Sequence, residues 1–260
     1  LWPNLILQAK KRGIKVVNPN RTPRNDYEII CNFLEKLRRE TEVFTGSPED
    51  FFRRMFEFKF LPPGRGLWAM GTDFVIEKSS APLYNCGFIS TKDIRNDLAF
   101  PFVWLMDMSL MGVGVGFDTL GAAIEFYLKK PRRTKDVHVI EDSREGWIDA
   151  FKRVLDAFSG SNTLPESFDY SLIRPAGSPI KTFGGIAPGS DPLRHLLERV
   201  EAYMQSYVDE DRSVDSTFIV DLMNFAGACV VAGGTRRTAE IAFGFPNDQE
   251  FLSLKSPEKV

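Results

Sequence analysis

Apolar residues recur along this chain with two different periods, which separates helical from extended segments. A spacing of three and four residues over 29–37, after a capping Asp26, predicts one helix. A second helix is predicted from Ser47-Pro48-Glu49-Asp50, which supplies a cap, a proline at the first helical position and acids in the first turn. It extends to Phe60, before a proline pair. The first 60 residues are therefore expected to be helical.

After residue 60, short apolar runs alternate with helical patterns. Helices are predicted over 97–111, 142–158, 191–204 and 214–225, the second of them ending at Gly160. Strands are predicted over 83–89, 170–173 and 239–243. Helices that alternate with strands favour an α/β fold with a largely parallel sheet over residues 61–260.

Composition and charge narrow the class of protein. The chain has 260 residues, of which 43% are hydrophobic and 26% charged, so it is globular. The net charge of −2 gives no general attraction to nucleic acid or to an anionic membrane. No run of 18 apolar residues and no signal peptide is visible, so we expect a cytoplasmic protein without membrane or direct nucleic-acid partners.

Cysteine and histidine are sparse. Cys31, Cys86 and Cys229 lie far apart, and His138 and His195 are the two histidines, so neither a metal site nor a disulfide scaffold is expected. Cys86 lies in an apolar run with no local feature that would lower its thiol pKa. Taken alone, Cys86 and Cys229 are therefore interpreted as small buried hydrophobic residues.

Two glycine-rich segments allow two interpretations each. The segment 112–117 is not the dinucleotide fingerprint, because Phe117 replaces the third glycine. It is either a site of close backbone approach to a ligand or a tightly packed strand, and the second is favoured when it is taken alone. The segment 233–238 carries Arg236 and Arg237 with two threonines, and suits a phosphate or nucleobase as well as a plain solvated loop.

Taken together, these segments resemble the large subunit of ribonucleotide reductase, and in particular its adenosylcobalamin-dependent, monomeric class. The resemblance spans roughly residues 50–258 and keeps the order of six motifs. They are Leu61-Pro-Pro-Gly-Arg-Gly-Leu-Trp68, Asn85-Cys86, Gly112-Val-Gly-Val-Gly-Phe117, Asp142-Ser-Arg-Glu-Gly-Trp147, Phe183-Gly-Gly185 and Val230-Val-Ala-Gly-Gly-Thr-Arg-Arg-Thr-Ala-Glu240.

The resemblance implies a fold and an activity. The fold would be a helical N-terminal region over 1–60, followed over 61–260 by the first half of a ten-stranded α/β barrel, with the second half absent. The activity would be the conversion of ribonucleoside triphosphates to 2′-deoxyribonucleoside triphosphates by thiyl-radical chemistry, for DNA synthesis. Adenosylcobalamin would be the cofactor, bound mostly outside this chain. A deoxynucleoside triphosphate effector, a thioredoxin-like reductant and a complementing C-terminal fragment would be the partners.

The same resemblance assigns roles to residues. Cys86 matches the first member of a redox-active cysteine pair. Matches to the substrate-binding positions are Gly66, Leu67, Asn85, Gly112, Gly114 and Gly116. Asp93 matches a position that binds the sugar of the effector, and the segment from Gly233 to Glu240 resembles the loop that relays effector identity. Its candidate effector contacts are Gly233, Gly234, Thr235, Arg236 and Arg237.

The chain departs from the family pattern in one large respect. The radical cysteine of the family lies in an Asn-x-Cys-x-Glu loop, and neither that loop nor a second redox cysteine follows Cys229. The segment between Asp118 and Glu141 is also short. We therefore expect the chain to be inactive alone. The alternatives are a non-catalytic deoxynucleotide-binding regulatory module and, less well supported, a NAD-dependent oxidoreductase.

Overall fold

The computed structural model describes residues 48–59, 63–180, 186–232 and 238–256. The chain divides into two compact units, residues 1–84 and 85–260, and each is described by itself. The helix predicted over 29–37 and the glycine–arginine segment 233–237 lie outside the described residues. A boundary between domains at residues 60 and 61 stays a prediction.

The described part of the first unit consists of short helices. They are α3 (Pro48–Phe56), α4 (Gly64–Ala69), α5 (Asp73–Glu77) and the 3-10 turn η1 (Ala81–Leu83). Helix α3 begins where the sequence predicts but ends before Phe60, because Phe58 has a left-handed backbone with a φ of 53°. Helix α4 starts directly after Pro63.

The second unit contains a parallel sheet of β1 (Cys86–Ile89), β2 (Gly114–Asp118) and β5 (Glu240–Phe243), in the order β1-β2-β5. Helix α6 (Phe100–Leu110) connects β1 to β2, and α9 (Ser216–Val231) precedes β5. Parallel strands joined by helices confirm the α/β class predicted from the sequence.

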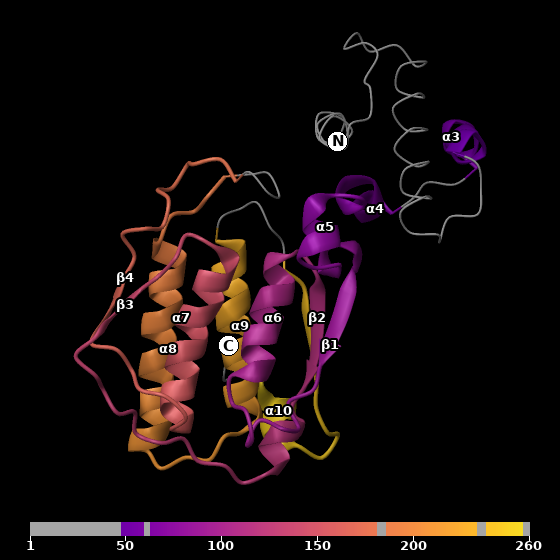
Figure 1. The fold of residues 1–260 in the computed structure, drawn as a ribbon. Helices are drawn as coiled ribbons and strands as arrows, with labels where there is room; N and C mark the ends of the chain where they lie inside the picture. The colour runs from indigo at the N-terminus through magenta and orange to yellow at the C-terminus, as the bar shows by residue number, and fades with distance from the viewer. Residues whose placement is uncertain (1–47, 60–62, 181–185, 233–237, 257–260) are drawn as a thin grey trace. The chain divides into compact units, whose positions relative to one another are not determined.

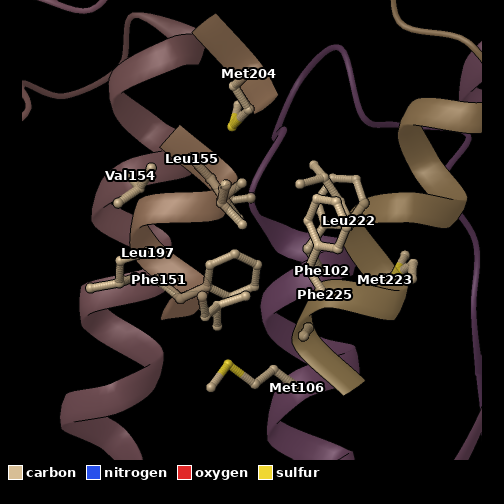
Figure 2. Close-up of a cluster of buried hydrophobic side chains, with 14 of the residues drawn as sticks. Phe102, Met106, Phe151, Val154, Leu155, Leu197, Met204, Leu222, Met223 and Phe225 are labelled. Atoms are coloured by element: carbon tan, nitrogen blue, oxygen red, sulfur yellow. The ribbon is translucent and has the colours of Figure 1, made fainter. Parts of the chain in front are cut away.

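Four helices form the main core beside this sheet. Helices α7 (Arg144–Ser159) and α8 (Asp191–Asp209) pack on the side of α6 and α9 that faces away from the strands (Figure 1). Figure 2 shows buried side chains from all four helices meeting at their centre. They include Phe102 and Met106 of α6, Phe151 and Leu155 of α7, Leu197 and Met204 of α8, and Leu222 and Met223 of α9.

Local signals in the sequence set the ends of these helices. The Ser143 hydroxyl accepts a hydrogen bond from Gly146 N–H at 2.9 Å and caps α7, which ends at Gly160 with a φ of 82°. Asp215 caps α9 by accepting from Phe218 N–H at 2.7 Å. Helix α9 continues to Val231, beyond the predicted end at residue 225, because the apolar residues that follow fit the buried side of the same helix.

A second, smaller parallel sheet lies at the margin of the unit (Figure 1). It pairs β3 (Val137–Val139) with β4 (Ser167–Asp169). The strand predicted over 170–173 was wrong, because Asp169 accepts a hydrogen bond from Ser171 N–H at 2.8 Å and starts a turn there. Two further short elements are η2 (Leu120–Ala123) and α10 (Gln249–Ser253). Within the described ranges, no helix has both the length and the apolar character needed to cross a membrane.

Candidate active site

The two faces of the three-stranded sheet differ. Val115 and Phe117 point into the helical core, and a Cβ added to Gly87 on that face would lie 2.9 Å from Trp104 Cη2. On the other face Phe88 and Phe243 are about half exposed, with ring centroids 6.0 Å apart. Because side chains alternate along a strand, one face is packed by helices and the other is open and largely apolar.

Cys86 lies at the beginning of β1 on the open face, and its thiol is exposed. The register pairs it with Gly114, and the Asn85 carbonyl accepts a hydrogen bond from Gly114 N–H at 2.9 Å. A Cβ at Gly114 would make only ordinary contacts of 3.5 Å, with Ala239 and with the Asn85 carbonyl oxygen. The backbone beside the Cys86 thiol is therefore bare although a side chain would fit there.

The other two glycines of this segment have structural reasons of their own. Gly112 has a φ of 82° and makes the turn from α6 into β2, its N–H donating to the Ser109 carbonyl at 2.8 Å. A Cβ at Gly116 would lie 3.1 Å from the Phe88 ring and 3.3 Å from Ile241. Gly112 thus serves the turn and Gly116 the aromatic packing, whereas beside Gly114 the described residues leave space for a side chain.

The two described cysteines occupy opposite environments. The interpretation of Cys86 as a buried hydrophobic residue was wrong, because Cys86 lies on the face of β1 that the helices do not cover. The same interpretation is confirmed for Cys229, which lies in the helical core, where burial raises the pKa of its thiol to about 12. Of these two thiols, only that of Cys86 is available for chemistry.

A buried polar network lies at the carboxyl ends of β1 and β2, opposite the end of β1 that carries Cys86. Thr91 donates from its N–H at 2.8 Å and from its hydroxyl at 3.0 Å to Asp118 Oδ1, and Gly121 N–H donates to the Thr91 hydroxyl at 3.0 Å. These bonds tie the end of β1 to the end of β2. Asp93 follows Thr91 in an exposed turn, so it lies at the opposite end of β1 from Cys86. The sequence motifs did not indicate this network.

The structure brings together only some of the residues assigned from the sequence. Cys86, Gly114 and Gly116 share one region of the open face, and the Asn85 carbonyl lies beside Gly114. Gly66 and Leu67 belong to α4 in the first unit, and 233–237 lie outside the described residues. The chain that follows this segment returns to the site, because the Ala239 carbonyl accepts from Val115 N–H at 2.8 Å.

Comparison with known proteins identifies the family. The insertion domain of B12-dependent ribonucleotide reductase matches residues 120–204, which include α7 and most of α8. The ribonucleotide reductase alpha domain matches residues 20–72. The chain belongs to the ribonucleotide reductase family. Within that family it belongs to the B12-dependent branch, whose insertion domain it carries.

Curated relatives agree with this family. An adenosylcobalamin-dependent ribonucleoside-triphosphate reductase from Euglena gracilis is 46% identical over 81% of this chain and 29% of its own length. A probable adenosylcobalamin-dependent ribonucleoside-triphosphate reductase from Dictyostelium discoideum is 42% identical over 91% of this chain and 33% of its own length. The chain therefore spans about a third of the length of these relatives.

A solved structure shares the fold. It is the crystal structure of a B-12 dependent (class II) ribonucleotide reductase, which superposes with a TM-score of 0.71 over 98% of this chain and 43% of that chain. The sequence identity is 20%, so this likeness supports the fold alone.

Proposed function

We propose that this chain is part of an adenosylcobalamin-dependent ribonucleotide reductase that converts ribonucleoside triphosphates to 2′-deoxyribonucleoside triphosphates. The observation that carries the proposal is the exposed thiol of Cys86 beside the bare backbone of Gly114. A ribose can approach a peptide backbone closely only where side chains are missing. The curated relatives bear the name of this activity.

In this proposal Cys86 is one member of a reducing thiol pair. The two thiols supply two protons and two electrons, the ribose loses its 2′-hydroxyl as water, and the sulfurs are left joined as a disulfide. Cys229 does not suit the second position, because it lies in the helical core with a raised thiol pKa. We assign the partner thiol to the part of the relatives that this chain does not span, and its re-reduction to a thioredoxin-like protein.

The open face of the sheet supports a half-barrel. Phe88, Ile241 and Phe243 are exposed side by side on parallel strands, and apolar surface of this kind usually marks a contact that remains to be made. In the proposal this face lines the interior of a ten-stranded barrel, and a complementing C-terminal part covers it. The 260-residue chain alone would then be inactive.

In this proposal adenosylcobalamin binds mostly to the part of the relatives that this chain does not span. His138 lies 3.5 Å from Asp149 and packs against Phe168, and the part of the chain that the structure describes contains no cluster of His, Cys, Asp and Glu that could hold a metal ion. Effector binding is assigned to Asp93 and to residues 233–237, where the proposal rests on the sequence motif.

A chimera tests the catalytic proposal. The corresponding segment of the Euglena gracilis relative would be replaced by this chain, and reduction of a ribonucleoside triphosphate would be measured with a dithiol reductant. We expect activity in the chimera and its loss to background on Cys86→Ser. Cys229→Ser is the matched control, which should keep turnover because that thiol is buried.

Two other outcomes would count against the proposal. Equal turnover of the Cys86→Ser chimera and its parent would remove Cys86 from the reaction. An inactive but folded chimera, together with tight binding of deoxynucleoside triphosphates by the 260-residue chain, would favour the non-catalytic regulatory module instead.

A further inference from the structure

Glu240, the first residue of β5, places its carboxyl group in an unusual position. Unlike Ile241 and Phe243, it points away from the open face and toward the helices. Both carboxylate oxygens are shielded from solvent. The nearby Thr238 hydroxyl acts on the carboxyl group, but it bonds Ser109 and does not reach either oxygen with hydrogen-bond geometry. An ionised carboxylate without partners is strongly disfavoured in such a place.

Gly227 makes room for this carboxyl group. A Cβ added to Gly227 on α9 would overlap Glu240 Oε1, so any other residue there would displace the Glu240 side chain. Thr238, two residues earlier, turns to the same side, and its hydroxyl lies 3.2 Å from the Ser109 hydroxyl of α6. The beginning of β5 is thus attached to both helices that cover the sheet.

The surroundings of Glu240 contain no described charge that would hold it ionised. On α6, Asp107 is bonded to Arg144; on β2, Asp118 is bonded to Thr91; on α9, Asp221 accepts from Tyr203 and Cys229 is a buried thiol. Burial raises the pKa of Glu240 to about 7, against a smaller opposing effect of the Thr238 hydroxyl. The proton that this carboxyl gains or loses near neutrality exchanges with solvent.

We propose that Glu240 is a proton-dependent latch, whose neutral carboxyl holds the beginning of β5 against Gly227 and whose ionisation loosens this contact. Loosening of this contact weakens the hydrogen bond from Val115 N–H of β2 to the Ala239 carbonyl, which directly precedes β5. A link between this latch and effector binding would rest on the proposed function, which assigns the preceding segment 233–237 to the relay of effector identity. The latch itself does not depend on that function. Glu240 is a positioning residue in this scheme.

The direction of the pH dependence follows from the raised pKa. A carboxyl group whose pKa is higher in the folded protein than in the unfolded chain stabilises the fold at low pH. That stabilisation is complete below the unfolded value of about 4.5 and is lost as the pH rises through about 7. Local opening of β5 should therefore become easier between these two values.

Amide exchange of Val115 in the 260-residue chain tests the latch, because this N–H bonds the Ala239 carbonyl. We expect the opening equilibrium of wild type to rise by at least about tenfold from pH 5 to pH 8, after correction for intrinsic exchange. In Glu240→Gln, which keeps a neutral side chain of the same shape, it should stay nearly constant. Glu166→Gln is the matched control and should behave like wild type, because Glu166 is an exposed glutamate that directly precedes β4.

A direct titration keeps the proposal testable if Glu240→Gln does not fold. The ¹³C carboxyl resonance of Glu240 in wild type should titrate near neutrality. Titration at the ordinary value of about 4.5, or the same pH dependence of Val115 exchange in wild type and Glu240→Gln, would overturn the latch. Neither measurement involves nucleotides or turnover, so the reductase proposal is unaffected by either result.

Discussion

At the scale of single residues, Gly114 of β2 and Gly121 of η2 can be compared. A side chain would fit at Gly114 but not at Gly121, so the absence of a side chain at Gly114 has no steric cause. Gly114→Ala should leave the free energy of unfolding unchanged or raise it by up to about 1 kcal/mol, because the added methyl meets only ordinary contacts and glycine weakens a strand. The same change should lower turnover of the chimera, because the methyl occupies the bare backbone beside Cys86. Urea unfolding and the reductase assay measure the two effects separately.

Gly121→Ala is the comparison. Its Cβ would lie 2.7 Å from the Thr91 carbonyl oxygen and from Ile94, and the backbone there is fixed by the Asp118 network. We expect a loss of about 1–3 kcal/mol in unfolding free energy. If Gly114→Ala proved as destabilising as Gly121→Ala, the space beside Cys86 would be needed for folding and would carry no argument for a ligand.

At the scale of elements, loss of a helix cap is expected to lower the free energy of unfolding. Asp215 caps α9, accepts from the Tyr207 hydroxyl at 2.9 Å and pairs with Arg212 at 3.0 Å. Asp215→Ala should reduce the unfolding free energy by about 2 kcal/mol, since the cap is lost and a shielded tyrosine hydroxyl loses its acceptor. Asp209→Ala, at the exposed end of α8, should stay within about 0.5 kcal/mol of wild type in the same denaturation experiment.

The same caps explain which elements the sequence predicts. Ser143, Gly160 and Asp215 act on their own neighbours, so α7 and α9 can be located from local pattern alone. Strands β3 and β4 are three residues long, too short for a period-two pattern, and the apolar run at 170–173 is redirected by Asp169. The local sequence pattern cannot locate strands this short, because their formation depends on pairing with a strand that is distant in the sequence.

The candidate site was only partly accessible to sequence reasoning. Motif resemblance singled out Cys86 and the glycines, but the apolar run 83–89 does not show that one face of β1 is open, since its exposed side chains are themselves apolar. In the sequence, Glu240 stands only as the last residue of a motif. Its environment depends on Gly227 and Ser109, which are brought to it by α9 and α6.

At the scale of the second unit, the open sheet face predicts self-association of the 260-residue chain. Ile241→Thr combined with Phe88→Ser should reduce concentration-dependent association in sedimentation experiments, because both changes remove exposed apolar area from one patch. Val139→Thr on β3 removes a comparable exposed side chain elsewhere and should have little effect. If the double variant associated as strongly as wild type, the surface responsible for association would lie on another part of the chain.

The parallel order β1-β2-β5 also has a consequence for the time course of folding. Strand β2 pairs with β1 across a single helix, whereas Val115 pairs with Glu240 across about 125 residues that include the whole insertion. Closing so long a loop is slow, so β5 joins last, after the helices that hold it have formed. A ribosome making this chain must therefore release most of the second unit before β5 can join β2 and complete the three-stranded sheet.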